Sequence, residues 1–171
     1  MKYDYVSLYN KNAEFWNASP RLRRVIKIGN FVLIGLFIVA YAVLWTYALF
    51  IEPLNPKELV RIAFPPPLAL LIAGTIRLAM DCPRPYAEKG AKITPISRKK
   101  TDGKSFPCLL LTFATAVSTV FLPFFPAVGG LMFIWSVLFA YVRFTLGLHY
   151  PSDLLMGMGL GIAVGAFAFV L

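Results

Sequence analysis

A run of 38 residues without a charged side chain, Ser105 to Val142, limits the possible folds of this chain more than any other feature. As a single helix it would be about 57 Å long at ~1.5 Å per residue, nearly twice the ~30 Å hydrocarbon thickness of a bilayer. The run must therefore fold back on itself. The segment 122–130, which contains two prolines and two glycines, supplies the break.

The composition indicates that the chain lies in lipid. Of the 171 residues, 58% are hydrophobic and only 15% are charged, whereas a water-soluble domain carries about a quarter charged residues. A chain this apolar also does not stay solvated as a disordered polymer. We therefore exclude both classes and predict an all-α fold, a polytopic membrane helix bundle.

Other apolar segments complete the expected bundle. The segment 28–51 is long enough to cross the bilayer, and so is 62–80. Three consecutive prolines, Pro65 to Pro67, predict a kink or a late helix start in the second of these spans, because proline does not fit a regular helix interior.

The last apolar segment, 151–171, contains Gly157, Gly161 and Gly165 at four-residue spacing. Small residues at this spacing let a neighbouring helix approach closely. Together the apolar segments predict about five transmembrane helices, with 81–104 as the long polar loop.

The N-terminal residues 1–27 are polar, aromatic and basic, a mixture typical of a helix in the headgroup layer. The first apolar run begins too far along the chain, and is too long, for a cleavable signal peptide. We expect an interfacial segment at 1–27 and a single membrane-embedded domain at 28–171. A disordered polar tail is the alternative for residues 1–27.

Ionisable and polar side chains gather at three places near the ends of the expected spans. Because an up-and-down chain alternates direction, all three places lie at the same membrane face. Arginines there can converge on one anion, and backbone N–H groups at helix starts add donors. The residues concerned are Arg77 and Arg84, then Lys104 and Ser105, then Arg143, His149 and Asp153.

His149 is the only histidine in the sequence, and Asp153 lies four residues further on. At one helical turn the carboxylate can accept a hydrogen bond from one ring nitrogen and leave the other as a nucleophile or base. One histidine and scattered acids do not make a metal-ligand set, so we expect no metal and no cofactor.

These residues resemble the signature of the type 2 phosphatidic acid phosphatase superfamily, which comprises membrane and soluble phosphatases. The first part of that signature is a basic residue, six positions, then Arg-Pro, and Arg77 with Arg84-Pro85 matches it. The third part is Ser-Arg, five positions, His, three positions, Asp. Arg143, His149 and Asp153 match its spacing, with Val142 in place of the serine.

The second part departs from the family pattern. The family has Pro-Ser-Gly-His or Pro-Ser-Arg-His, whereas this chain reads Pro107-Cys108-Leu109-Leu110. The resemblance covers roughly residues 60–160 and implies a bundle of membrane helices with a site at one surface.

The resemblance implies a phosphohistidine mechanism. His149 would attack phosphorus, Asp153 would orient it, and the three arginines would bind the phosphoryl oxygens, with Lys104 and Ser105 as further phosphate-binding candidates. The family histidine that protonates the leaving group is replaced by Leu110.

Loss of a general acid lowers a rate by typically ~10²–10⁴-fold. An alkoxide leaving group feels that loss fully, whereas a phosphomonoester leaving from a diphosphate needs little protonation. We therefore expect a membrane lipid phosphate or diphosphate phosphohydrolase that favours lipid diphosphates, such as a polyprenyl (undecaprenyl) diphosphate. The alternative is a pseudoenzyme that binds lipid phosphates or serves as a membrane interaction protein. A cysteine phosphatase is excluded, because no arginine follows Cys108 at a loop-closing distance.

The net charge of +9 is unevenly distributed. Only Lys57 and Arg61 mark one membrane side, and the other 15 of the 17 Lys and Arg lie on the side of the N-terminus and the site. The positive-inside rule places that side in the cytoplasm, whereas most membrane members of the resembled family face outward, so the orientation stays open. Basic residues near a membrane ordinarily mark topology, so we expect no nucleic-acid partner for Arg98-Lys99-Lys100. We expect a multi-pass protein of a bacterial cell membrane.

Overall fold

The computed structural model describes residues 2–51, 53–87, 93–97 and 103–170, which form seven α-helices and no strand. The basic triplet at 98–100 lies outside the described residues. The helices are α1 (Lys2–Asn17), α2 (Pro20–Phe50), α3 (Pro56–Ala63), α4 (Pro65–Ala79), α5 (Leu109–Phe121), α6 (Pro126–Thr145) and α7 (Pro151–Phe167).

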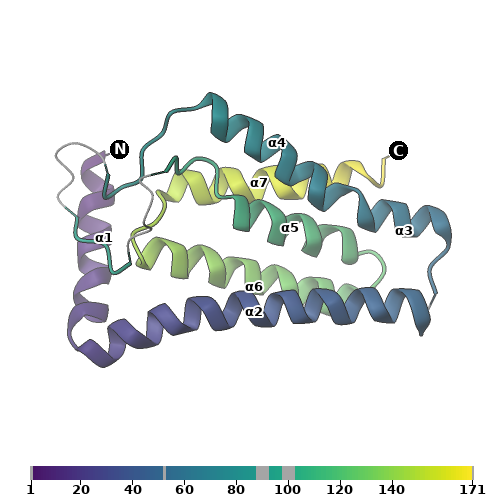
Figure 1. Ribbon diagram of the computed structural model, residues 1–171, viewed down its shortest axis with the longest axis horizontal. Helices are drawn as coiled ribbons and strands as arrows, with labels where there is room; N and C mark the ends of the chain where they lie inside the picture. Colours follow the sequence, from purple (N-terminus) through teal and green to yellow (C-terminus); the bar gives the residue numbers. More distant parts are fainter. Residues whose placement is uncertain (1, 52, 88–92, 98–102, 171) are drawn as a thin grey trace.

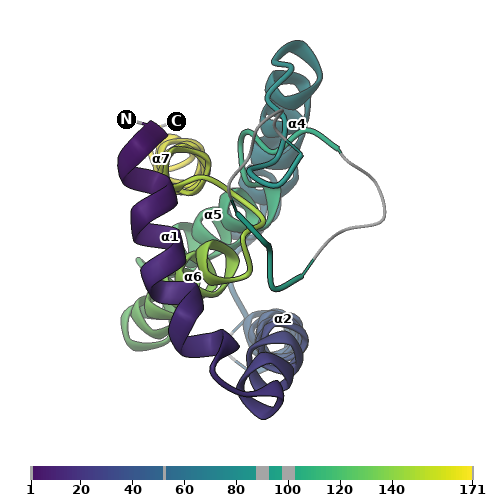
Figure 2. The same cartoon turned by 90° about the vertical axis from the view of Figure 1, so that its left-hand side faces the viewer.

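The long helices run side by side along one direction, and α1 lies across one end of the bundle (Figure 1). Viewed from that end, α1 crosses in front of α6 and α7, and α2 stands at the edge of the bundle (Figure 2). The predicted all-α bundle with a separate N-terminal helix is confirmed.

Among the residues that the structure describes, three helical segments are long and apolar enough to cross a membrane, namely α2, α6 and the consecutive pair α3 and α4. Helices α5 and α7 are also apolar but shorter. Large apolar side chains are exposed along α2, among them Phe31, Val39 and Val43. Exposed apolar surface of this extent is typical of contact with lipid, so the protein is an integral membrane protein.

Two helix starts differ from the sequence prediction. The first long helix begins at Pro20 rather than at residue 28, because the Ser19 side chain accepts a hydrogen bond from the Leu22 N–H and caps it. The second span begins at Pro56 rather than at residue 62, where Asn55 and Glu58 form a reciprocal capping box. Polar caps thus extend both helices beyond their apolar runs.

The predicted interruption at the three prolines is confirmed. Helix α3 ends at Ala63 and α4 begins at Pro65, so the prolines occupy the first turn of α4. Proline is tolerated there because the first N–H groups of a helix have no partner within it.

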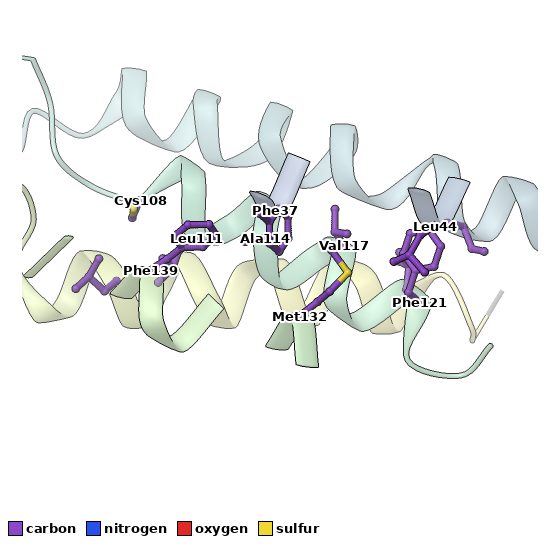
Figure 3. Close-up of a cluster of buried hydrophobic side chains, with 12 residues drawn as sticks. Phe37, Leu44, Cys108, Leu111, Ala114, Val117, Phe121, Met132 and Phe139 are labelled. Atoms are coloured by element: carbon purple, nitrogen blue, oxygen red, sulfur yellow. The ribbon is translucent and has the colours of Figure 1, made fainter. Parts of the chain in front are cut away.

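The core of the bundle is centred on α5, which packs against α4, α6 and α7. Phe37 and Leu44 of α2 and Phe139 of α6 join the same cluster of buried side chains (Figure 3). Leu111, Val117 and Phe121 of α5 are fully buried. Phe37 of α2 and Phe139 of α6 meet edge to face with ring centroids 5.5 Å apart, a favoured geometry for aromatic pairs.

The glycines of α7 pack against α5, as their spacing predicts. A Cβ at Gly157 would lie 2.8 Å from the Cys108 carbonyl oxygen, and one at Gly165 would lie 2.8 Å from the Thr119 Cβ. The backbones of the two helices therefore touch, and this contact fixes the start of α5 beside the start of α7.

Candidate active site

The site residues come from four helix ends that lie near α1 (Figures 1 and 2). Arg77 is in the last turn of α4 and Arg143 is in the last turn of α6. Asp153 is in the first turn of α7, and His149 lies in the short connection just before it. The Cys108 backbone N–H donates to the Asp153 carbonyl oxygen at 3.1 Å, which ties the start of α5 to α7.

Ser105 connects two of these elements through its main chain. Its carbonyl oxygen lies 3.0 Å from His149 Nδ1 and accepts a hydrogen bond from Arg77 Nη2 at 2.9 Å. Because a carbonyl oxygen can only accept, Nδ1 of His149 must carry the hydrogen of this bond. In the neutral ring Nε2 then has the free lone pair.

The Asp153 carboxylate accepts hydrogen bonds from two groups in the same region. Its Oδ2 accepts a hydrogen bond from the Ser105 hydroxyl at 2.7 Å and from the Tyr150 backbone N–H at 3.0 Å. The same oxygen lies 3.6 Å from His149 Nδ1. The carboxylate is thus beside the imidazole, as the four-residue spacing predicts, but its short hydrogen bonds go to Ser105 and Tyr150.

The arginines bring a buried excess of positive charge. Arg84 and Arg143 are 4% and 9% exposed, and Asp153 is the single acidic residue among the buried side chains of the described chain. Arg84 Nη1 donates to the Leu148 carbonyl oxygen at 3.2 Å. The Nε atoms of Arg77, Arg84 and Arg143 are buried and have no hydrogen-bond partner among the described residues. Buried charges and donors of this kind require an anionic partner.

Lys104 lies outside this network. Its ammonium group donates to the Leu78 carbonyl oxygen at 2.7 Å and is 3.7 Å from Asp81 Oδ1. Leu78 and Asp81 flank the end of α4, so Lys104 fastens the loop to that helix. Its role as a phosphate ligand stays a prediction.

Cys108 is a residue of the site that the sequence interpretation did not include. The buried Cys108 thiol lies close enough to the buried His149 ring to influence its ionisation. Burial opposes ionisation of the thiol, but the contacts with His149 and the charge of Arg143 outweigh it, so the pKa of Cys108 is lowered. Its place at the start of α5, in the degenerate second part of the signature, was the available signal.

The pKa of His149 moves in the opposite direction. Burial lowers it, but the neighbouring Asp153 carboxylate and Cys108 thiol outweigh burial and leave the pKa raised above its ordinary value. His149 therefore has the Asp153 carboxylate 3.6 Å from its Nδ1 and the Cys108 thiol as a further neighbour.

Helix α1 packs over the loop that carries His149. Tyr9 donates a hydrogen bond to the Thr94 carbonyl oxygen at 3.0 Å, and the Tyr5 ring packs tilted against the Tyr150 ring with centroids 4.8 Å apart. Gly147 has φ +73°, and a Cβ there would lie 3.0 Å from the Tyr9 hydroxyl. Glycine thus provides both the left-handed turn before His149 and the room for α1.

Among the described residues no group of three or more His, Cys, Asp and Glu side chains is arranged to hold a metal ion. The acceptor groups near the arginines are one carboxylate, one thiol and backbone carbonyls. The arrangement suits an anion with several oxygens, which the free guanidinium donors can bind.

The fold and the site define a helical membrane protein with a buried, arginine-lined anion site beside a single imidazole. The chain belongs to the PAP2 superfamily, a superfamily of phosphoric ester hydrolases, because the family model matches residues 59–171. The resemblance of the sequence motifs to this superfamily is thereby confirmed. No curated protein matches the chain significantly by sequence.

Two solved structures share the fold. LpxE of Aquifex aeolicus gives a TM-score of 0.68 at 19% sequence identity, over 96% of each chain. A transmembrane PAP2-type phosphatidylglycerolphosphate phosphatase from Bacillus subtilis gives 0.63 at 17% identity, over 96% of this chain and 85% of that chain. Likeness at these identities establishes the fold, including the segment before residue 59.

Proposed function

We propose that the protein is a multi-pass bacterial membrane lipid phosphatase that works through a phosphohistidine. The observation that carries this proposal is the orientation of His149. Its Nδ1 is held by the Ser105 carbonyl oxygen at 3.0 Å, which leaves Nε2 as the nucleophilic nitrogen. The three arginines of the site have Nε atoms without a hydrogen-bond partner in the described part of the chain.

In the proposed reaction Nε2 of His149 forms a bond to phosphorus as the bond to the leaving oxygen breaks. The guanidinium groups of Arg77, Arg84 and Arg143 bind the phosphoryl oxygens and stabilise the charge of the transition state. Asp153, next to Nδ1, stabilises the positive ring that forms. Water then attacks the phosphohistidine and releases inorganic phosphate and the free ring.

The leaving group sets the substrate preference. Leu110 stands where the family has its acid histidine, and a leucine side chain carries no proton to donate. A phosphomonoester departing from a lipid diphosphate is stable as an anion, whereas the alkoxide of a lipid monophosphate needs a proton. We therefore propose that lipid diphosphates, such as undecaprenyl diphosphate, react faster than phosphatidate.

Phosphate release from a panel of lipids tests the proposal. The purified full chain in detergent is given undecaprenyl diphosphate, phosphatidylglycerol phosphate and phosphatidate, in parallel with the variant His149→Ala. We expect release to be fastest with the diphosphate and to vanish in the variant. Ser152→Ala, an exposed neighbour of the site, is the matched control and keeps its activity.

Three results would contradict the proposal. Faster release from phosphatidate than from the diphosphate removes the leaving-group argument. Retained phosphate release in His149→Ala would show that His149 is not the nucleophile. Absence of release from every lipid, with retained binding of lipid phosphate, indicates a pseudoenzyme instead.

A further inference from the structure

A groove separate from the catalytic residues lies where α1 ends and α2 begins. It has a volume of about 370 Å³ and is lined by Asn17, Pro20, Arg23, Arg24 and Lys27. Three of its five lining residues are cations, and none is acidic. The groove thus has a strongly positive wall and an amide that can donate or accept a hydrogen bond.

The three cations are exposed and available. Arg23, Arg24 and Lys27 are all exposed, and none of them forms an ion pair with another residue in the described part of the chain. They lie within the first two turns of α2, which has no acidic residue in its first turn. Repulsion among three like charges so close together favours an anion between them.

The surroundings of the groove distinguish a lipid from a free anion. Val25 and Ile28 alternate with the cations on α2 and are 60% and 54% exposed. Phe31, one turn further on, is 74% exposed. Residues 24, 28 and 31 share one helix face, so this face changes from cationic to apolar within two turns.

The position of α1 indicates the level of the groove relative to the membrane. Helix α1 lies across the end of the bundle (Figures 1 and 2), and its Phe15, two residues before Asn17, is 62% exposed. An aromatic side chain beside a basic cluster at the end of the membrane-crossing helices is typical of the headgroup layer.

We propose that this groove binds the phosphate group of an anionic phospholipid whose acyl chains lie along α2. Arg23, Arg24 and Lys27 neutralise the phosphate, and Asn17 hydrogen-bonds to the headgroup. The acyl chains cover the exposed face that begins at Ile28 and Phe31. The site is independent of the proposed phosphatase reaction, because none of its residues belongs to the His149 cluster.

Lipid retention in native mass spectrometry tests this proposal. The full chain is purified in detergent and titrated with dioleoyl phosphatidylglycerol or with zwitterionic dioleoyl phosphatidylcholine. We expect preferential retention of phosphatidylglycerol. Each of Arg23→Gln, Arg24→Gln and Lys27→Gln should weaken that retention about fivefold, the effect of one interfacial charge. Arg24→Lys, which keeps the charge, should restore most of the binding.

Arg21→Gln is the matched control. Arg21 is an exposed arginine in the first turn of the same helix but does not line the groove, so its loss should change retention by less than about twofold. Equal weakening by Arg21→Gln would mean general surface charge and would overturn the proposal. Equal retention of the two lipids would also overturn it. Displacement of the lipid by equimolar inorganic phosphate would show a site for a free anion instead.

Discussion

The Ser105 hydroxyl donates a 2.7 Å hydrogen bond to Asp153 Oδ2 across 48 residues of sequence. Both residues are buried, and the Ser105 carbonyl oxygen is also the acceptor for His149 Nδ1. One residue therefore links the carboxylate to the imidazole, with its side chain on Asp153 and its main chain on His149. Ser105 acts as a positioning residue in this arrangement, since its hydroxyl hydrogen is used by Asp153.

Ser105→Ala should therefore lower kcat/KM without removing the nucleophile. The substitution leaves a buried carboxylate oxygen with one donor fewer, a loss worth ~1–3 kcal/mol, or about fivefold in rate at the low end. Steady-state kinetics with the best lipid substrate measure the change.

Two further measurements distinguish a positioning role of Ser105 from a role in folding. Ser105→Ala should keep the helix content of wild type and lower the unfolding temperature by only several degrees, and acid quenching should still trap phosphoenzyme. A variant with unchanged kcat/KM would show that the Ser105–Asp153 bond does not contribute to the reaction.

The contact between Cys108 and His149 predicts a particular pH dependence. Attack needs the neutral imidazole, so activity should rise with pH as His149 loses its proton. Burial lowers the pKa of His149, but Asp153 and Cys108 raise it overall. The midpoint of the increase in activity should therefore lie at a higher pH than the ordinary pKa of a histidine, about 6.5. Removal of the thiol should lower the pKa of His149.

In Cys108→Ala the acidic limb of the kcat/KM profile should therefore move to lower pH than in wild type. Cys82→Ala provides a matched control, because Cys82 is the other free cysteine and is only partly buried. Its profile should coincide with that of wild type. A shift to higher pH in Cys108→Ala would have the wrong sign and would contradict the assignment of the contact.

The sequence predicted the parts of the site that depend on helix spacing. The charge-free run and its proline-rich break gave the alternation of helix directions, and this placed Arg77, Arg143 and His149 at one end. The one-turn separation of His149 and Asp153 follows from helix geometry alone. These features rest on hydrophobic periodicity, which the bilayer imposes strongly.

The sequence did not predict contacts made by loops and by main-chain atoms. Ser105 contributes a carbonyl oxygen that any residue type carries, and the thiol of Cys108 reaches His149 only because the starts of α5 and α7 are joined. The hydrogen bond from the Lys104 ammonium group to the Leu78 carbonyl oxygen is likewise not indicated by the position of Lys104 in the sequence. Such contacts depend on tertiary packing rather than on sequence spacing.

Arg143→Lys should weaken the binding of phosphate mimics. The Arg143 Nε is buried and has no partner in the described structure, and a lysine cannot supply the planar pair of donors that a guanidinium offers. Loss of a hydrogen bond to a charged group is worth ~1.5–3 kcal/mol, or about 10- to 100-fold. We expect the inhibition constant for orthovanadate to rise by that factor.

The control for this variant is Arg61→Lys in α3, at the opposite end of the bundle (Figure 1). Vanadate should inhibit it as it inhibits wild type. Equal sensitivity of the Arg143→Lys variant would mean that Arg143 does not bind the oxyanion.

The contact between α5 and α7 predicts opposite outcomes for two neighbouring glycines. A Cβ at Gly161 would collide with the Thr115 side chain and the Thr112 carbonyl oxygen and would lie 2.9 Å from the Ala116 nitrogen. Overpacking of this kind costs about 1–3 kcal/mol, so Gly161→Ala should unfold several degrees below wild type in detergent. A Cβ at Gly159 meets nothing within 4 Å, and alanine is the better helix former. Gly159→Ala should therefore unfold at or above the wild-type temperature, and equal destabilisation of both variants would contradict the packing of α7 on α5.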